Sequence, residues 1–223
     1  MASERIRRSS NETRAQVLAA AQRLFYWQGI HSTGIDKVAA EAGVAPTTLY
    51  RLFASKDDLV TGYVTANAEP YKVWVADVTR VEVGSPRQRI LALFDALAEQ
   101  VQPDRCRGCP FLMTLAEFPE PDHPARLAAI ETKAWVREHL TRLTTELAAE
   151  TPLAEPAILA DQLVIAMEGV YATVQALGAD GPARQGRSVA EALLDTACTK
   201  PHDAEQHTPP PTSQTPTAES WPH

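Results

Sequence analysis

The chain has 223 residues, of which 44% are hydrophobic, so it is long enough to bury a core in one or two domains. Its formal net charge of −7 is unevenly divided, because residues 1–56 carry +4 and residues 57–223 carry −11. A basic N-terminal part on an acidic remainder concentrates a phosphate-attracting field at one end of the chain.

Several classes of protein find no support in the sequence. The first 15 residues lack the apolar segment of a secretory signal, and no unbroken apolar run approaches the roughly 18 residues of a membrane span. Three cysteines, an odd number, do not indicate a disulfide framework. Gly-rich phosphate loops, nucleophile elbows and His-Glu-x-x-His motifs are absent, so no enzyme activity and no cofactor is indicated. We therefore expect a cytoplasmic protein that does not enter a membrane.

The first segment of the chain is basic and polar. Residues 1–12 carry Arg5, Arg7 and Arg8, and they would be either an arm along a DNA groove or a solvated basic terminus. A helix is predicted next, from about Thr13 to Trp27, with its apolar residues on one face.

Residues 33–53 predict two short helices joined by a tight turn. Thr33 is placed to cap the first helix, and Asp36, three residues later, would complete a capping box. Gly43 falls where a left-handed residue is wanted, and Pro46 falls in the first turn of the second helix. A helix, a glycine turn and a second helix form the arrangement of a helix-turn-helix DNA reader.

The second of these helices divides into an apolar and a polar side. Leu49, Leu52 and Phe53 point inward together, and Thr47 and Arg51 lie opposite them. An arginine there can donate two hydrogen bonds to guanine, and a threonine can contact a base edge or a thymine methyl. The alternative is an ordinary amphipathic hairpin whose polar face meets water.

Residues 13–59 resemble the DNA-binding domain of the TetR family of bacterial transcriptional regulators. The matching segments are Ala20-Ala21-Gln22-Arg23-Leu24-Phe25, Gly29, Thr33-Gly34-Ile35, Val38-Ala39, Ala42-Gly43-Val44, Thr48-Leu49-Tyr50-Arg51-Leu52-Phe53 and Ser55-Lys56-Asp57-Asp58-Leu59. The resemblance implies that four residues hold the DNA backbone, namely Thr33, Thr48, Tyr50 and Lys56. It also implies that Thr47 and Arg51 face bases. Ala45 departs from the capping Ser or Thr of many relatives, which removes a cap that contributes about 1 kcal/mol.

Residues 56–200 predict an all-helical body behind a helix-turn-helix domain of residues 13–55. Ser55 would cap a helix that runs to about Val78, with Asp58 completing a capping box. Further helices are predicted over residues 87–101, 111–117, 125–150, 155–177 and 183–199. Residues 201–223 contain six prolines among polar residues and are expected to be disordered.

Large side chains are spread over several body helices. In the family that this chain resembles, small molecules bind between the body helices, and the residues expected to line such a pocket are Tyr71, Trp74, Phe94, Phe111, Met113, Trp135, Met167 and Tyr171. Taken singly, each of these residues is more often an ordinary core residue than part of a pocket.

The helix predicted from residue 155 is apolar on two sides, so it is either central in its domain or shared with a partner. In the family that this chain resembles, the last two helices pair across a twofold axis. The residues expected at this dimer interface are Ile165, Gly169, Ala172, Ala176, Leu193 and Ala197.

The spacing Cys106-x-x-Cys109, with Asp122 or His123 further on, allows a metal or redox site. A zinc site needs a second Cys/His pair at ligand spacing, which the chain lacks, so no metal is expected. The alternative is a buried structural Cys109 at a helix start.

These observations predict a dimeric, all-α, ligand-responsive transcriptional regulator. We expect a repressor that a small-molecule effector releases from a double-stranded, palindromic DNA operator by tilting the helix that starts at Lys56. Two alternatives stay open: a thiol-redox or metal-responsive regulator acting through Cys106 and Cys109, and a helical protein-interaction module with a vestigial DNA-binding head.

Overall fold

The structure is a computed structural model that describes residues 9–102, 106–178 and 180–199. Over these residues the regular secondary structure is entirely helical, which confirms the all-α prediction. The α-helices are α1 (Ser10–Gln28), α2 (Ile35–Glu41), α3 (Pro46–Leu52), α4 (Lys56–Val78), α5 (Pro86–Gln100), α6 (Pro110–Glu117), α7 (Pro124–Glu150), α8 (Pro156–Leu177) and α9 (Gly186–Thr199). Two short 3-10 helices, η1 (Val81–Val83) and η2 (Pro182–Gln185), lie between them.

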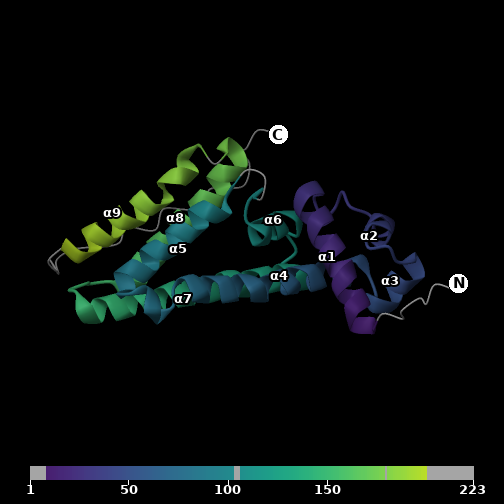
Figure 1. The fold of residues 1–223 in the computed structure, drawn as a ribbon, viewed down its shortest axis with the longest axis horizontal. Helices are drawn as coiled ribbons and strands as arrows, with labels where there is room; N and C mark the ends of the chain where they lie inside the picture. The colour runs from purple at the N-terminus through teal and green to yellow at the C-terminus, as the bar shows by residue number, and fades with distance from the viewer. Residues whose placement is uncertain (1–8, 103–105, 179, 200–223) are drawn as a thin grey trace, which may run out of the picture.

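The molecule is elongated, with a head of α1 to α3 at one end and a body of α4 to α9 behind it (Figure 1). Helix α4 runs from the head along α7, and α5, α8 and α9 form the far part of the body. The short helix α6 lies between the head and the rest of the body. Head and body therefore share α4 as a common rod.

Helix α1 starts earlier than the sequence predicts. The Ser9 hydroxyl accepts the N–H of Glu12 at 3.2 Å, and the Glu12 carboxylate accepts the N–H of Ser9 at 2.7 Å. This capping box starts the helix at Ser10 rather than Thr13, so Glu12 belongs to the helix and not to an arm. The predicted arm up to residue 8 and the predicted tail of residues 201–223 lie outside the described residues.

Polar side chains of α1 satisfy the C-terminal ends of the two helices packed on it. Arg14 donates to the carbonyl of Leu52 at 2.8 Å and lies over the ring of Phe53, with its guanidinium carbon 4.1 Å from the ring centre. Gln16 donates to the carbonyl of Ala42 at 2.6 Å. Because the last carbonyls of a helix have no partner within it, these contacts fix the ends of α2 and α3 against α1.

The turn between α2 and α3 has the predicted geometry, whereas the start of α2 does not. Gly43 has φ +62°, the left-handed conformation that the sequence demands there, and Pro46 is the first residue of α3. Helix α2 starts after Gly34 without a side-chain cap. Thr33 is fully buried and its hydroxyl donates to the carbonyl of Gly29 at 2.8 Å, so the predicted capping box with Asp36 is wrong.

Helix α4 has the predicted bounds and a modified cap. The Ser55 hydroxyl accepts the N–H of Asp58 at 3.0 Å, but the Asp58 carboxylate accepts the N–H of Ala54, at 2.9 Å, instead of that of Ser55. Pro70 lies inside this helix and cannot donate a backbone hydrogen bond to the preceding turn. The rod between head and body is therefore weakened in its second half.

Four body helices, α5 to α8, have a proline as their first residue. The missing N–H of proline costs nothing at that position, so the proline belongs to the helix. The predicted helices were therefore correct in number and place, with starts displaced by about one residue. Before α9, residues 182–185 form η2, so α9 begins at Gly186 rather than at Ala183.

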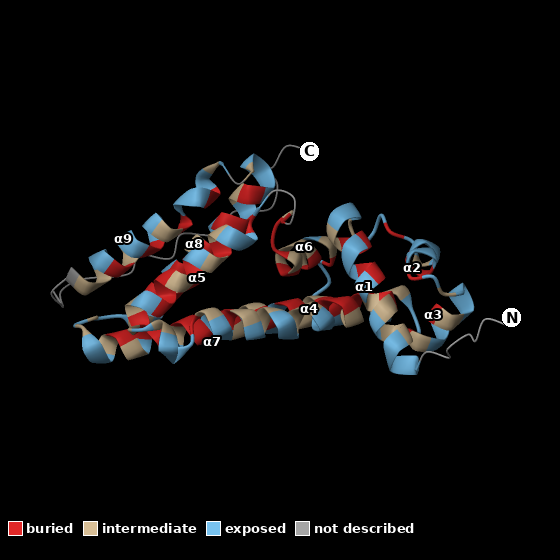
Figure 2. Ribbon diagram, viewed as in Figure 1, coloured by how far each residue is buried: buried red, intermediate tan, exposed pale blue. Residues whose placement is uncertain are grey.

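Helix α8 is a long, strongly apolar helix although charged and polar residues interrupt its sequence. Its 22 residues include a window of mean hydropathy 1.4, which by length and composition alone is enough to cross a membrane. In the structure this helix packs on α7 and α9, and 39% of the window is buried. Figure 2 shows buried residues where the body helices meet, and the buried residues of α8, such as Leu159, Leu163 and Met167, recur at helical spacing, so this helix has one core face and one outward face.

A buried histidine makes the body sensitive to acid. His139 on α7 is only 5% exposed, and its Nε2 lies 2.7 Å from the Thr79 hydroxyl. Burial, together with the charges of Arg142 and Arg89, lowers its pKa from 6.5 to about 4, against the opposing effect of Glu146. His139 is therefore neutral in the folded protein at pH values where it is protonated in the unfolded chain.

We predict that this group destabilises the fold as the pH falls. The unfolded chain takes up a proton below about pH 6.5 that native His139 accepts only near pH 4, so about 3 kcal/mol of stability is lost, most of it between these two pH values. Urea unfolding at several pH values would measure it for the wild type and for His139→Gln. The variant should lack this part of the slope, and parallel curves for the two proteins would contradict the assignment.

Candidate functional site

The outward face of α3 is polar and open to solvent. Thr47, Tyr50 and Arg51 are exposed, Tyr50 to 53%, and Thr48 is half-buried at the edge of the same face. Leu49, on the opposite side, is fully buried and holds the helix on the domain. The structure therefore brings four of the predicted DNA-contacting residues together on one short helix.

Lys56 lies beside this helix, at the first turn of α4. Its side chain is half-buried and its Nζ donates to the carbonyl of His31 at 3.3 Å. An ammonium has three donors, so this contact positions the group and leaves others available. The N-terminus of α4 adds its unpaired backbone N–H groups at the same place.

Thr33 does not belong to this surface. Its side chain is fully buried, its hydroxyl donates to Gly29, and its backbone N–H donates to Ile30 at 3.2 Å. Both donors are used in closing the loop between α1 and α2. The structure therefore assigns Thr33 to the loop, and the predicted contact of its side chain with DNA is withdrawn.

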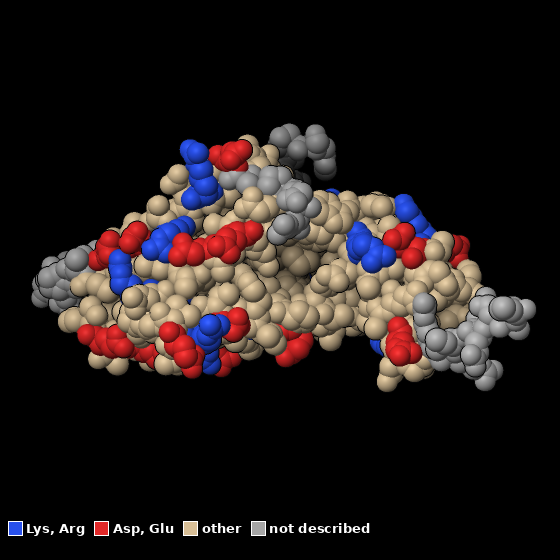
Figure 3. All heavy atoms as spheres, in the orientation of Figure 1, with Lys and Arg blue, Asp and Glu red and all other residues tan. Residues whose placement is uncertain are grey.

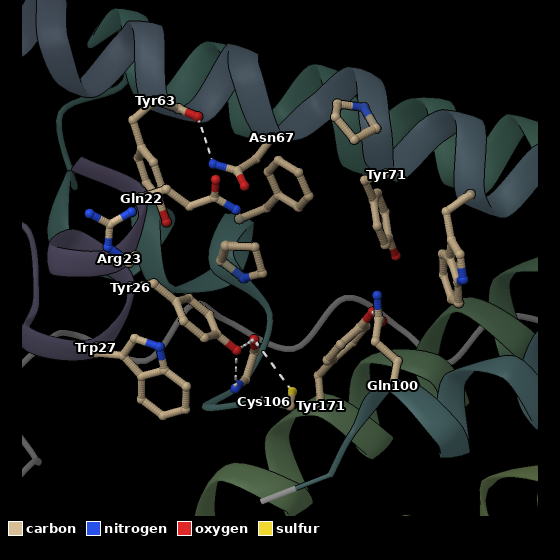
Figure 4. Close-up of a pocket in the computed structure, with 15 residues that line it drawn as sticks. Gln22, Arg23, Tyr26, Trp27, Tyr63, Asn67, Tyr71, Gln100, Cys106 and Tyr171 are labelled. Atoms are coloured by element: carbon tan, nitrogen blue, oxygen red, sulfur yellow. Dashed lines mark hydrogen bonds between the residues drawn. The ribbon is translucent and has the colours of Figure 1, made fainter. Parts of the chain in front are cut away.

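A cavity of about 490 Å³ opens between the head and the body. Figure 3 shows the hollow in the surface between these two parts, and Figure 4 shows the side chains that surround it. The lining residues come from α1, α4, α6, the ends of α5 and α8, and the loop before α6. They are Gln22, Arg23, Tyr26, Trp27, Tyr63, Asn67, Pro70, Tyr71, Trp74, Gln100, Cys106, Gly108, Pro110, Phe111 and Tyr171.

Half of the predicted pocket residues line this cavity. Tyr71, Trp74, Phe111 and Tyr171 do so. The other four predicted residues, Phe94, Met113, Trp135 and Met167, do not.

These four residues lie elsewhere for physical reasons. Phe94 and Met167 are fully buried between body helices and serve as core. Trp135 stacks on His139, with ring centres 5.1 Å apart, in a separate hollow along α7. Met113 is half-buried on α6, away from the wall of the cavity.

The prediction from sequence missed the wall that the head contributes. Tyr26 and Trp27, at the end of α1, lie outside the apolar face that packs on the helix-turn-helix. Two adjacent aromatic residues off the core face of a helix are the signal that would have revealed a second packing surface.

Tyr26 also fastens the head to the loop before α6. Its hydroxyl accepts the N–H of Arg107 at 2.6 Å and the N–H of Gly108 at 3.2 Å, and it donates to the carbonyl of Gly108 at 2.9 Å. Arg107 returns a hydrogen bond to the carbonyl of Tyr26 at 2.8 Å. Burial, followed by the neighbouring Cys106, raises the pKa of Tyr26 well above its usual value, so the hydroxyl stays protonated.

A second fastening lies at the other end of α6. The Glu117 carboxylate accepts the backbone N–H groups of Ile30 at 3.0 Å and His31 at 2.7 Å. The His31 ring also lies against Phe118, and its Nε2 is 2.7 Å from the carbonyl oxygen of Glu117. Hydrogen bonds to a charged carboxylate are stronger than neutral ones, so α6 holds the loop between α1 and α2 firmly.

The two cysteines of the Cys106-x-x-Cys109 spacing have different surroundings. Cys106 borders the cavity, whereas Cys109 is buried at the start of α6 with its sulfur 3.7 Å from the Lys133 ammonium. Burial raises the pKa of Cys109, and Lys133 opposes this only in part. A buried thiol of raised pKa is a poor nucleophile, which favours the structural interpretation of Cys109.

The metal alternative for this segment has no cluster to support it. His123 accepts the N–H of Ala125 at 3.3 Å as the cap of α7, and its ring stacks on Phe118. Within the described residues, no three His, Cys, Asp or Glu side chains gather as a metal would require.

The predicted dimer residues of α8 lie on an open face. Ile165, Gly169, Ala172 and Ala176 are all exposed in the single chain, Ile165 to 71%. A side chain added at Gly169 would meet no atom within 4 Å. Leu193 and Ala197 of α9 are half-buried against the core of the same chain. The four positions of α8 form an apolar surface that the single chain leaves uncovered.

Comparison with known proteins agrees with the geometry. Residues 17–62 match the family model described as bacterial regulatory proteins, tetR family, and residues 86–190 match the tetracyclin repressor-like C-terminal domain. The HTH-type transcriptional regulator YjdC of Escherichia coli is 28% identical over 156 residues, which span 70% of this chain and 80% of that protein. The HTH-type transcriptional activator FasR of Mycolicibacterium smegmatis is 31% identical over 94 residues, 42% of each chain.

Solved structures show the same arrangement. The crystal structure of a TetR-family transcriptional regulator from Streptomyces coelicolor superposes with a TM-score of 0.78 at 27% identity, over 85% of this chain and 92% of that one. The fold and the exposed polar face of α3 define this class of protein as a helix-turn-helix DNA-binding regulator. The chain belongs to the TetR family of bacterial transcriptional regulators, and it is a regulator rather than an enzyme.

The Glu117 contacts lead to a prediction about local stability. Replacing Glu117 with alanine removes hydrogen bonds to a charged group, each of which contributes about 1.5–3 kcal/mol. Amide hydrogen exchange at Ile30 and His31 should then accelerate by about tenfold or more, because local opening of the loop becomes easier. Glu120→Ala, at an exposed glutamate near the same helix, is the matched control and should leave both amides protected. Unchanged exchange in Glu117→Ala would contradict the role given to this carboxylate.

Proposed function

We propose that this chain is a homodimeric repressor that binds a palindromic operator through α3 and releases it when a small molecule occupies the cavity. The observation that carries the proposal is the division of α3, which presents Thr47, Tyr50 and Arg51 to solvent above a fully buried Leu49. A recognition helix needs this combination of a fixed back and a hydrogen-bonding front. An ordinary hairpin, or a vestigial head, has no need to keep an exposed tyrosine and arginine side by side.

The proposed contacts divide by their chemistry. Arg51 and Thr47, at the centre of the exposed face, would read base edges in the major groove. Thr48, Tyr50 and Lys56, on its two sides, would hold phosphates and set the register. The basic residues of the head supply attraction for any duplex, while the acidic body in Figure 3 would keep the DNA at the head.

A dimer is supported by the uncovered apolar face of α8. Ile165 is 71% exposed, and the small residues Gly169 and Ala172 follow it along the same helix. Small residues allow two helices to approach closely, and two heads are needed to reach two half-sites of a palindrome. We infer that α8 and α9 of one chain pair with those of a second chain.

The switch that we propose uses the cavity's two-sided wall. Tyr26 and Trp27 belong to the head, whereas Tyr71 and Phe111 belong to the body, so an occupant touches both. Pro70, beside the cavity, is the position where α4 lacks a backbone hydrogen bond and bends most easily. A ligand that fits one arrangement of head and body better than the other shifts the balance between them, by no more than its difference in affinity for the two.

The direction of control and the place of action follow from this mechanism. If the effector moves the two heads away from the spacing that DNA requires, the protein leaves the operator. Transcription then begins when the ligand binds, which is the behaviour of a repressor. FasR, a relative named as an activator, shows that a related sequence is compatible with the opposite outcome, and the effect of the ligand on transcription distinguishes the two. Because bacterial DNA lies in the cytoplasm and the proposed operator is DNA, we propose that the protein acts in the bacterial cytoplasm.

The direct test is fluorescence anisotropy of the protein with DNA from upstream of its own gene and with a scrambled duplex, at two salt concentrations. We expect tighter binding to the upstream DNA and a steep fall with salt. Equal weak binding to both duplexes would argue for the interaction-module alternative. Adding a thiol oxidant tests the redox alternative, since release by the oxidant alone would favour Cys106 and Cys109 as the sensor.

Two substitutions separate the proposed base and phosphate contacts. Arg51→Ala should cost about 1–3 kcal/mol of operator binding and relax the sequence preference, because the guanine contact is lost. Lys56→Ala should weaken all duplexes alike and lower the salt slope by about one. Arg80→Ala, which removes an exposed arginine just beyond the far end of α4, is the control and should change neither quantity. Indistinguishable behaviour of Arg51→Ala and Lys56→Ala would refute this division of roles.

A charge on the open face of α8 should separate the dimer. Ile165→Glu would place a carboxylate opposite its own symmetry mate in a desolvated interface, so the variant is expected to sediment as a monomer and to lose operator binding. Val81→Glu, at a valine of the same 71% exposure on η1, is the matched control and should remain dimeric. A dimeric Ile165→Glu would place the interface elsewhere.

A further inference from the structure

The cavity between head and body has a wall of unusual uniformity. Seven of its 15 lining residues are aromatic, and among all of them only Arg23 carries a full charge. Arg23 lies at the rim, where its side chain is 58% exposed and already forms an ion pair with Glu41 at 2.8 Å. No aspartate, glutamate, lysine or histidine is among the lining residues. The surface offered to an occupant is thus made mainly of ring faces and ring edges.

One wall residue has a buried polar atom without a partner. The hydroxyl of Tyr71 is buried and makes no hydrogen bond of normal geometry with the part of the chain that the structure describes, although the Tyr171 hydroxyl lies near enough to act on it. Figure 4 shows it directed across the cavity toward Gln100 and Tyr171. Burial raises the pKa of Tyr71, with a smaller contribution from Cys109 and an opposing one from the Tyr171 hydroxyl, so the group is a protonated donor. A buried donor without an acceptor is unfavourable, and it indicates what an occupant would supply.

Gln100 contributes a second donor at the same place. Its Oε1 accepts the hydroxyl of Tyr171 at 2.7 Å, which fixes the amide and turns its nitrogen the other way. In Figure 4 this nitrogen faces the side of the cavity where Tyr71 lies. The Tyr71 hydroxyl and the Gln100 amide therefore approach one region of the cavity from opposite sides, and both can donate there.

We propose that the cavity binds an uncharged, flat aromatic molecule that carries a carbonyl or similar hydrogen-bond acceptor, with its rings between the aromatic side chains and its acceptor between Tyr71 and Gln100. This inference rests on the proposed function, because it names the chemical class of the effector. The cavity, at about 490 Å³, lies in the range of small-molecule sites and has room for fused rings. Offset and edge-to-face packing of rings on Tyr26, Tyr63 and Trp74 supplies the attraction.

Charged molecules fit this wall poorly. An anion would leave water for a cavity whose single cation is already paired with Glu41, and burying an unpaired charge is costly. An organic cation would gain from the ring faces. It would, however, meet the donor groups of Tyr71 and Gln100 and the guanidinium of Arg23, and no carboxylate of the lining would balance it.

The occupant would also explain why the head takes part in the site. Tyr26 lines the cavity with its ring while its hydroxyl holds Arg107 and Gly108, so a molecule against that ring presses on the fastening between α1 and the loop before α6. An aromatic ligand of this class thus acts on the contact that sets the position of the head, without touching α3.

Four naphthalene probes of nearly equal shape test the proposal. They are a naphthyl methyl ketone, ethylnaphthalene, naphthoate and naphthyl trimethylammonium, and their affinities for the full chain would be measured by titration calorimetry. We expect the ketone to bind tightest, and ethylnaphthalene to bind about tenfold more weakly because it lacks the acceptor. Tighter binding of naphthoate or of the trimethylammonium probe, or no binding of either neutral probe, would overturn the proposed class.

The substitution Tyr71→Phe, combined with the two neutral probes, gives a double-mutant-type cycle in which any effect of the substitution on folding cancels. It removes only the hydroxyl, so it should weaken the ketone about tenfold and leave ethylnaphthalene within about twofold. The hydrocarbon serves as the control for any general disturbance of the cavity. Equal losses for the two neutral probes would show that Tyr71 does not donate to the ligand and would overturn its assignment.

Operator binding, measured in the same samples, keeps the two proposals apart. If the ketone binds as expected but no upstream DNA is bound, the proposed function fails and the ligand class stands. If upstream DNA is bound and a charged probe both binds tightest and releases it, the proposed function stands and the ligand class is overturned.

Discussion

Two sets of hydrogen bonds hold the head on the body, and both involve the ends of the segment that contains α6. At one end, Tyr26 exchanges hydrogen bonds with Arg107 and Gly108, and at the other the Glu117 carboxylate accepts the N–H groups of Ile30 and His31. The head is also joined to the body through α4, and the His31 ring lies against Phe118 just after α6. The angle of the recognition helix therefore depends on where α6 lies. A short helix fastened at both ends is well suited to transmit a small displacement, because neither end can slip independently.

The cavity lies against the hydrogen bonds of Tyr26. A ligand in the cavity can therefore affect the position of the head directly, without a change that passes through the core of the body. Tyr26 is at once a wall residue and a hydrogen-bonding partner of the α6 loop. Pro70, which also lines the cavity, weakens α4, so α4 and the hydrogen bonds of Tyr26 can change together. Such a device needs only two arrangements of similar free energy and a ligand that prefers one of them. The extent to which a ligand can shift this equilibrium is limited by its difference in affinity for the two arrangements, not by its overall affinity.

Features that depend on neighbouring residues could be predicted from the sequence, whereas features that depend on contacts between distant parts of the chain could not. Gly43, Pro46 and the division of α3 follow from local backbone and helix geometry, and the structure confirms them. Thr33 was assigned wrongly because the loop bonds that bury it are invisible in the pattern of residues. The cavity was half predicted, since a residue such as Phe94 and one such as Tyr71 look alike until the packing of distant helices decides between core and wall. The contribution of α1 was missed for the same reason: Tyr26 meets Gly108 only in the folded chain.

The central claim is that occupancy of the cavity changes the position of the heads relative to each other. A spin label at the exposed Ala40 of α2 in each chain of the dimer would report the distance between the two heads by double electron–electron resonance spectroscopy. The account predicts a narrow distribution on operator DNA, where the recognition helices must lie roughly 34–36 Å apart to enter successive major grooves. Adding the naphthyl methyl ketone should shift or broaden the distribution as the DNA is released. A saturating ligand that leaves the distance unchanged, with DNA still bound, would contradict the account.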